Sequence, residues 1–166
     1  VKIVSYVLYL SILFHAVEGL WLAWQNKKAR PVSYKKSKVS EVSIWSSRNM
    51  GVLGTIILAF IILHMAQFWY TYKWGEIPID AAGNRDMAEV VIATYTDAQW
   101  GLFMVIVYVI AQVAIGFHLW HGFESSFQSM GISSKKKNIL QVIGRCYAVI
   151  ISLLFAIIPV YVYLNA

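Results

Sequence analysis

The sequence predicts an all-α protein, a bundle of membrane-spanning helices, and three observations predict it. Of the 166 residues, 59% are hydrophobic and only 13% are charged, whereas about a quarter of the residues of a soluble domain are charged. Tryptophans gather near the ends of the apolar stretches, where aromatic residues meet the lipid headgroups. Four stretches reach the length of about 20 residues that a helix needs to cross a bilayer. They cover residues 3–24, 50–72, 100–127 and 139–164 of a single domain over residues 1–166.

The charges of the connections predict the direction of the spans. Residues 25–49 contain seven Lys and Arg against one Glu, and residues 128–138 contain three Lys and no acid. Residues 73–99 contain five acids against two bases, with a short amphipathic helix expected around residues 87–94. Basic connections of membrane proteins lie in the cytoplasm, so we expect both ends of the chain outside. The net charge of +6 therefore reflects topology, although the lysines at 135–137 also suit anionic lipid.

All four histidines, His15, His64, His118 and His121, lie inside the expected spans. Ionisable residues are costly at membrane depth and usually face a functional interior. At about 1.5 Å per residue, His15 and His118 each lie roughly 15 Å from the inner end of their spans. These two should therefore meet at one depth. His64 lies roughly 12 Å from the outer end of its span, in the other leaflet, where the sequence shows it no partner.

Paired histidines on facing helices hold haem iron from both sides in b-type cytochromes of helical bundles. Gly19 and Gly122 each follow a histidine of the pair His15 and His118 by four residues, on the same helix face. We expect both glycines to leave room for the macrocycle, although they could serve helix packing alone. His121 has no such glycine, so we expect it to touch the haem edge or a propionate, or to make a core hydrogen bond.

Charged residues near the inner ends of the spans could complete this site. Arg48 or Arg145 could hold a haem propionate, because Arg forms bidentate pairs with carboxylates. For Arg145 we favour extension to the lipid headgroups. Glu18 and Glu124 could hydrogen-bond the site or pair with the arginines. No catalytic residue is assigned, and the single cysteine, Cys146, excludes an internal disulfide and a thiolate metal site.

Four segments carry a resemblance to a known family. They are FHAVEGL around His15, SSRNMGVLG before the second span, LHMAQFW around His64 and FHLWHGFESSFQSMGI around His118. In this order they resemble the single-subunit, two-haem cytochrome b anchors of succinate dehydrogenases and fumarate reductases, in detail those of Bacteroidetes-type enzymes. The resemblance covers essentially the whole chain.

The resemblance implies five spans, of which the first would precede this sequence. Its histidine would pair with His64 on the distal haem, while His15 and His118 would hold the proximal haem. Arg48 resembles an arginine near the proximal haem, and His121 falls where relatives need no ligand.

The resemblance also implies a function. The anchor would lie in the bacterial inner membrane and pass electrons through two haems b between the partner subunits and a quinone, commonly menaquinone. The partners would be a flavoprotein subunit carrying FAD, which oxidises succinate, and an iron–sulfur subunit, both docked on the basic cytoplasmic face. One departure is Gly116, which stands where some fumarate reductases have a proton-transferring glutamate. It slightly favours the succinate-oxidising direction.

Two other interpretations stay open. The cytochrome b of a hydrogenase, formate dehydrogenase or ferric reductase would also hold haem, with its histidines paired differently along the helices. A haem-free transporter or scaffold would use the histidines only as hydrogen-bonding groups between helices. A bound b-type chromophore would distinguish the second interpretation from the others.

Overall fold

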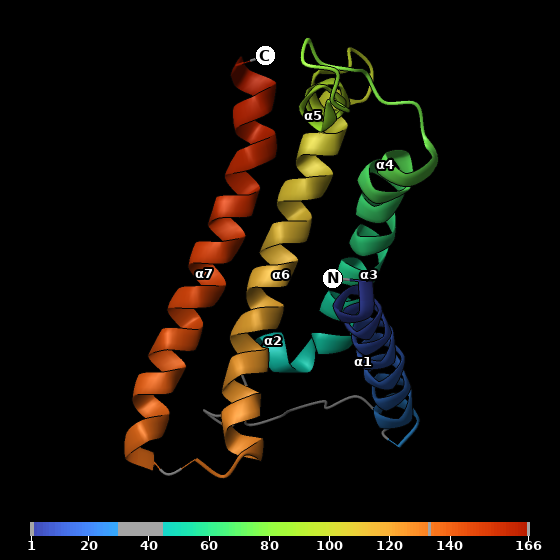
Figure 1. Ribbon diagram of the computed structural model, residues 1–166. Coiled ribbons are helices and arrows are strands. Elements are labelled where there is room, and N and C mark those ends of the chain that lie inside the picture. The colour runs from blue at the N-terminus through green and yellow to red at the C-terminus, as the bar shows by residue number, and fades with distance from the viewer. Residues whose placement is uncertain (1, 30–44, 133, 166) are drawn as a thin grey trace.

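The computed structural model describes residues 2–29, 45–132 and 134–165, and in these ranges the chain forms a bundle of long helices without a strand (Figure 1). The bundle consists of α1 (Lys2–Ala29), α3 (Met50–His64), α6 (Gly101–Ser129) and α7 (Ser134–Asn165). A π-helical turn, η1 (Met65–Tyr70), and α4 (Thr71–Trp74) continue α3, while α2 (Trp45–Arg48) precedes it and α5 (Met87–Thr96) precedes α6.

Four segments are long and apolar enough to cross a membrane: Lys2–Ala29, Met50–Trp74, Gly101–Phe127 and Ile139–Asn165. They confirm the all-α class and the four expected spans, and α5 confirms the short helix expected around residues 87–94. The chain is therefore a multi-pass membrane protein. Much of the first basic connection, residues 30–44, and the side chains at 135–137 lie outside the described residues.

Side-chain caps and one glycine set the turn from α5 into α6. Asp86 caps α5 by accepting hydrogen bonds from the backbone N–H groups of the first turn, at 2.9 and 3.1 Å. The Asp97 carboxylate accepts hydrogen bonds at 2.9 and 2.7 Å from the backbone N–H groups of Gln99 and Trp100, in the turn directly before α6. A Cβ at Gly101 would overlap the backbone carbonyl of Tyr95. Only glycine fits there, so α5 folds back tightly against the start of α6.

Small residues bring α6 and α7 together along their length, with α6 between α7 and α3 (Figure 1). A Cβ on Gly116 would lie 3.0 Å from the Ser152 hydroxyl oxygen, and a Cβ on Gly144 would lie 2.8 Å from the Phe123 Cβ. A side chain at 116 would therefore crowd Ser152 on α7. This close approach gives a packing reason for the departure at Gly116.

The buried core lies where α3, α5 and α6 meet. Tyr95, Val105 and Tyr108 form a buried cluster, against which Phe60 and Phe68 pack. Helix α1, in contrast, has no buried residue and packs mainly on α3. The region around α1 is therefore packed less completely by side chains than the core between α3, α5 and α6.

Candidate functional site

His15 on α1 and His118 on α6 face each other across the bundle. Their ring centroids lie 6.0 Å apart, and the ring planes are inclined by 87°. Two imidazoles that bind one metal from opposite sides, each nitrogen about 2 Å from it, have ring centres roughly 6 Å apart. The expected meeting of these two histidines at one depth is confirmed, while their ligation of haem iron stays a prediction.

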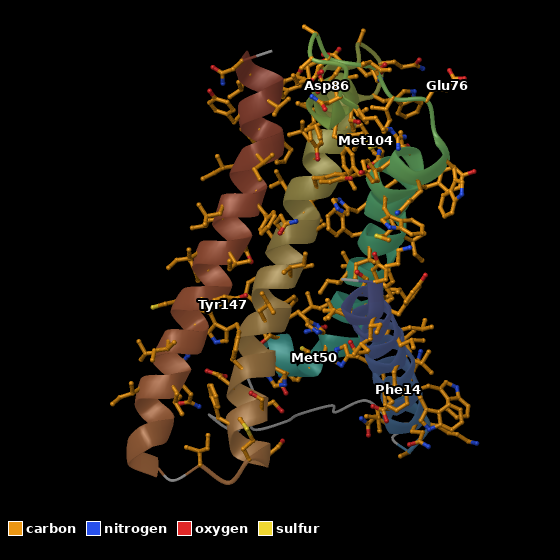
Figure 2. All side chains as sticks on the ribbon, viewed as in Figure 1. Phe14, Met50, Glu76, Asp86, Met104 and Tyr147 are labelled. Carbon is orange, nitrogen blue, oxygen red and sulfur yellow. The ribbon has the colours of Figure 1, made fainter. Side chains whose placement is uncertain are left out.

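A cavity of about 870 Å³ adjoins this pair and is lined by α1, α2, α3 and His118. This volume lies in the range of roughly 300–1,000 Å³ that small-molecule and cofactor sites occupy. The lining is largely apolar, as that of a macrocycle pocket must be, and includes Met50, which Figure 2 shows at the junction of α2 and α3. The cavity has the size and chemistry that a haem needs.

The Nδ1 atom of His118 is buried and has no hydrogen-bond partner among the described residues. A buried polar atom without a partner costs free energy of about 1–3 kcal/mol. The ring nitrogens of His118 thus make no hydrogen bond to the described residues. In contrast, His15 is exposed on α1 and turns its ring toward His118.

Glycines form part of the cavity wall. Gly19 lines it, and a Cβ there would meet no atom within 4 Å, as expected from its spacing after His15. Two further glycines, on α3, were not predicted from the sequence as part of the site. Gly54 also lines the cavity with open space around it, and a Cβ on Gly51 would lie 3.1 Å from the Ala23 Cβ, so α1 approaches α3 closely there. Their spacing of three residues, which places them on one helix face, is the signal that could have found them.

Two expected neighbours of the haem, Gly122 and His121, do not line this cavity. Gly122 is exposed, with open space around its Cβ position. His121 is half-buried on α6, one turn after His118. Their roles stay predictions.

The two candidate arginines differ in their surroundings. Arg48 lines the cavity and is placed to bind an anionic group there. Arg145 instead forms an ion pair with the buried carboxylate of Glu124, in which its Nε donates a hydrogen bond at 2.8 Å. Its guanidinium also lies 5.2 Å from the centroid of the Trp120 ring. The expectation that Glu124 pairs with an arginine is confirmed. The expected extension of Arg145 to the lipid headgroups is not observed, because its guanidinium is bound to Glu124.

His64 ends α3 directly before the π-helical turn η1 and lies apart from the other histidines. Its ring packs against Phe60, Phe68 and Tyr108, with centroids 5.7, 5.2 and 6.1 Å away. In the described ranges, no second histidine ring contacts it. π-Helical turns inside α-helices are frequent at functional sites, and this one was not apparent from the sequence.

The ligand set also bears on the kind of metal. Within residues 2–29, 45–132 and 134–165, no three His, Cys, Asp or Glu side chains come together to hold a metal ion. Haem iron takes only two further ligands from the protein, because the macrocycle fills its other four positions. No protein-family model, curated protein or solved structure matches the chain significantly.

Proposed function

We propose that this chain is the haem-carrying membrane anchor of a succinate:quinone oxidoreductase. The observation that carries the proposal is the pair His15 and His118, whose rings lie 6.0 Å apart beside a cavity of about 870 Å³. Together with the sequence resemblance, this pair points to a b-type haem in the bundle interior. When bound, haem supplies one-electron transfer.

The residues of the chain have distinct roles in this proposal. His15 and His118 would hold the iron of the proximal haem. Gly19 and Gly54 keep the wall free of side chains, and Arg48 binds a propionate with its guanidinium. His64 binds the distal iron, and its partner comes from the expected first span.

The remaining parts of the proposal concern surroundings and partners. The basic connections face the cytoplasm of a bacterial inner membrane, because positive charge is retained on that side. The iron–sulfur and flavoprotein subunits dock there, and the quinone, commonly menaquinone in enzymes of this kind, reacts within the membrane. Electrons then travel between the soluble subunits and the quinone through the two haems.

The test uses the full-length protein purified from membranes with its partner subunits. We expect a b-type band in the reduced-minus-oxidised absorption spectrum, and we expect succinate to reduce it. A purified protein without such a band would contradict the haem assignment. A band that is reduced by hydrogen or formate and not by succinate would retain the haem and exclude this enzyme.

A further inference from the structure

Residues 73–99 contain only two bases, Lys73 and Arg85, and both lie against the same aromatic ring. The Arg85 guanidinium carbon lies 4.9 Å from the centroid of the Tyr72 ring, and the Lys73 Nζ atom lies 5.9 Å from it. Neither base forms an ion pair with a carboxylate of the described residues, although the same connection contains five acids. An aromatic face attracts a cation and leaves its charge uncompensated. Both bases are therefore available to an anion.

The Arg85 side chain is held on one side by the backbone at the end of α4. Its Nη2 donates a hydrogen bond at 3.3 Å to the carbonyl oxygen of Gly75. The backbone of Arg85 also pairs with that of Ile79 in an isolated antiparallel bridge. The other guanidinium nitrogens make no hydrogen bond to the described part of the chain. A planar guanidinium held in this way can bind a phosphate with two N–H groups at once.

Aromatic side chains place these two bases at the level of the lipid headgroups. The membrane-spanning segment Met50–Trp74 ends at α4. The rings of Trp69 and Trp74 lie 5.1 Å apart, and Trp74 is 64% exposed. Exposed tryptophans at the end of a span lie where the acyl chains meet the headgroups. Both bases therefore lie beside the phosphates of the bilayer.

The charge of the whole connection disfavours an anionic lipid at this site. Two bases and five acids give residues 73–99 a net charge of −3, which repels a headgroup of net negative charge. Three of the acids, Asp80, Asp86 and Asp97, accept hydrogen bonds from backbone N–H groups and keep their charge in this connection. A headgroup whose phosphate is balanced by a cation avoids the repulsion.

Glu76 offers a partner for such a cation. It directly follows Gly75, whose carbonyl binds Arg85, and Figure 2 labels it at the top of the bundle, in the connection after α4. Its exposed carboxylate accepts no hydrogen bond from the residues that the structure describes. A primary ammonium can donate hydrogen bonds to this carboxylate, whereas the quaternary ammonium of choline has no N–H to donate.

We propose that Tyr72, Lys73, Glu76 and Arg85 bind the headgroup of phosphatidylethanolamine. Tyr72 holds the guanidinium of Arg85, which binds the phosphate. Lys73 approaches the same phosphate with its flexible side chain, and Glu76 accepts hydrogen bonds from the ammonium. The site lies beside α4 at the membrane surface, and its occupation does not depend on the proposed haems.

The experiment measures lipid binding by native mass spectrometry of the full-length protein in detergent. Phosphatidylethanolamine, phosphatidylcholine and phosphatidylglycerol with identical acyl chains are titrated separately, and inorganic phosphate is the comparison anion. The variants Arg85→Gln and Glu76→Gln change the site. Lys28→Gln is the matched control, because Lys28 also lies over an aromatic ring, at 5.3 Å from the centroid of Trp24, but on α1.

We expect the wild type to bind phosphatidylethanolamine most tightly and phosphatidylglycerol most weakly. Arg85→Gln should raise the Kd of phosphatidylethanolamine about fivefold, because the phosphate loses a charge-assisted partner. Glu76→Gln should weaken phosphatidylethanolamine and leave phosphatidylcholine unchanged, and Lys28→Gln should alter no lipid. In the wild type, hydrogen exchange of residues 72–86 should slow when phosphatidylethanolamine is added, which carries the test if a variant does not fold.

Equal affinity of the wild type for phosphatidylethanolamine and phosphatidylglycerol would overturn the proposal, because the acids would then have no role. The same holds for an equal loss of affinity in Arg85→Gln and Lys28→Gln, which would show a general effect of charge. Unchanged hydrogen exchange of residues 72–86 would place the lipid elsewhere on the bundle. Displacement of the lipid by an equal concentration of inorganic phosphate would show a site for the free anion instead.

Discussion

The two histidine regions of this bundle use the same residue type in opposite surroundings. At His15 and His118, two rings meet beside a cavity of about 870 Å³ whose wall includes glycines, and α1 contributes no buried residue. At His64, one ring packs among Phe60, Phe68 and Tyr108 beside a cavity of about 460 Å³. The first region leaves much of its volume unfilled, whereas the second fills much of its own with aromatic side chains.

The difference shows what each region can accept. Interiors of proteins are close-packed, so a large cavity between helices that glycines keep open fits a bulky rigid group. Under the proposed function, the two facing imidazoles would hold the metal of that group. The His64 region provides one imidazole and a smaller cavity with mainly aromatic and aliphatic walls. Under the proposed function, it would provide one of the two imidazoles of the second haem.

The largest effect is expected from filling the His15 and His118 cavity. Gly19→Leu places a branched side chain into the open space of the wall, and it should abolish binding of the proximal haem without removing a ligand. Haem content per polypeptide, measured as the pyridine haemochrome, should fall from about two to about one, as expected for two bis-imidazole sites. Val113→Leu is the control, because the Val113 side chain is exposed on α6 and does not line the cavity. Equal haem loss in both variants would contradict the assignment of the cavity.

A substitution in the turn between α5 and α6 is expected to lower stability without removing a haem ligand. A Cβ at Gly101 would overlap the backbone carbonyl of Tyr95, and backbone cannot rotate away as a side chain can. Gly101→Ala should lower the free energy of unfolding by about 3 kcal/mol, measured by thermal unfolding in detergent. Gly122→Ala, with nothing within 4 Å of its Cβ, should cost nothing. A wild-type melting temperature for Gly101→Ala would show that the turn is looser than described.

A smaller effect is expected from the ion pair between α6 and α7. Glu124→Gln removes the negative partner of Arg145, whose side chain is 40% exposed, so solvent compensates part of the loss. The free energy of unfolding should fall by about 1–2 kcal/mol. The b-type absorption band should keep its position and intensity, because neither Arg145 nor Glu124 lines the His15 and His118 cavity. A shifted haem band in this variant would show that the pair belongs to the haem site.

The smallest effect concerns the connection outside the membrane. Hydrogen bonds from the backbone N–H groups of Asn84 and Ala82, with Asn84 the larger cause, hold the pKa of Asp80 below its ordinary value of 3.8. A lowered pKa stabilises the fold above the ordinary value, and this contribution disappears as the pH falls through the pKa of the folded protein. Hydrogen exchange at residues 80–86, corrected for intrinsic rates, should therefore rise below pH 3.8. Asp80→Asn should lose that pH dependence, and a variant that keeps it would assign the titration to another group.

The spans and the meeting of two histidines could be predicted from the sequence because both follow from length. Hydropathy locates a helix in the bilayer, and a fixed rise per residue gives the depth of His15 and His118. The rotation of each helix about its axis is not given by depth. The place of Gly54 in the cavity wall was therefore found only in the structure, and so was the choice of Glu124 over Glu18 as the partner of Arg145. The π-helical turn after His64 was missed because its hydrophobic pattern does not differ from that of an α-helix.

The central claim is that His15 and His118 serve one haem and His64 another. It is tested by redox titration of the b-type band in the full-length protein and in His15→Ala, His118→Ala and His64→Ala. We expect two redox components in the wild type, loss of the same component in His15→Ala and His118→Ala, and loss of the other in His64→Ala. If His15→Ala and His118→Ala remove different components, or if His64→Ala removes the one that depends on His118, the pairing is wrong.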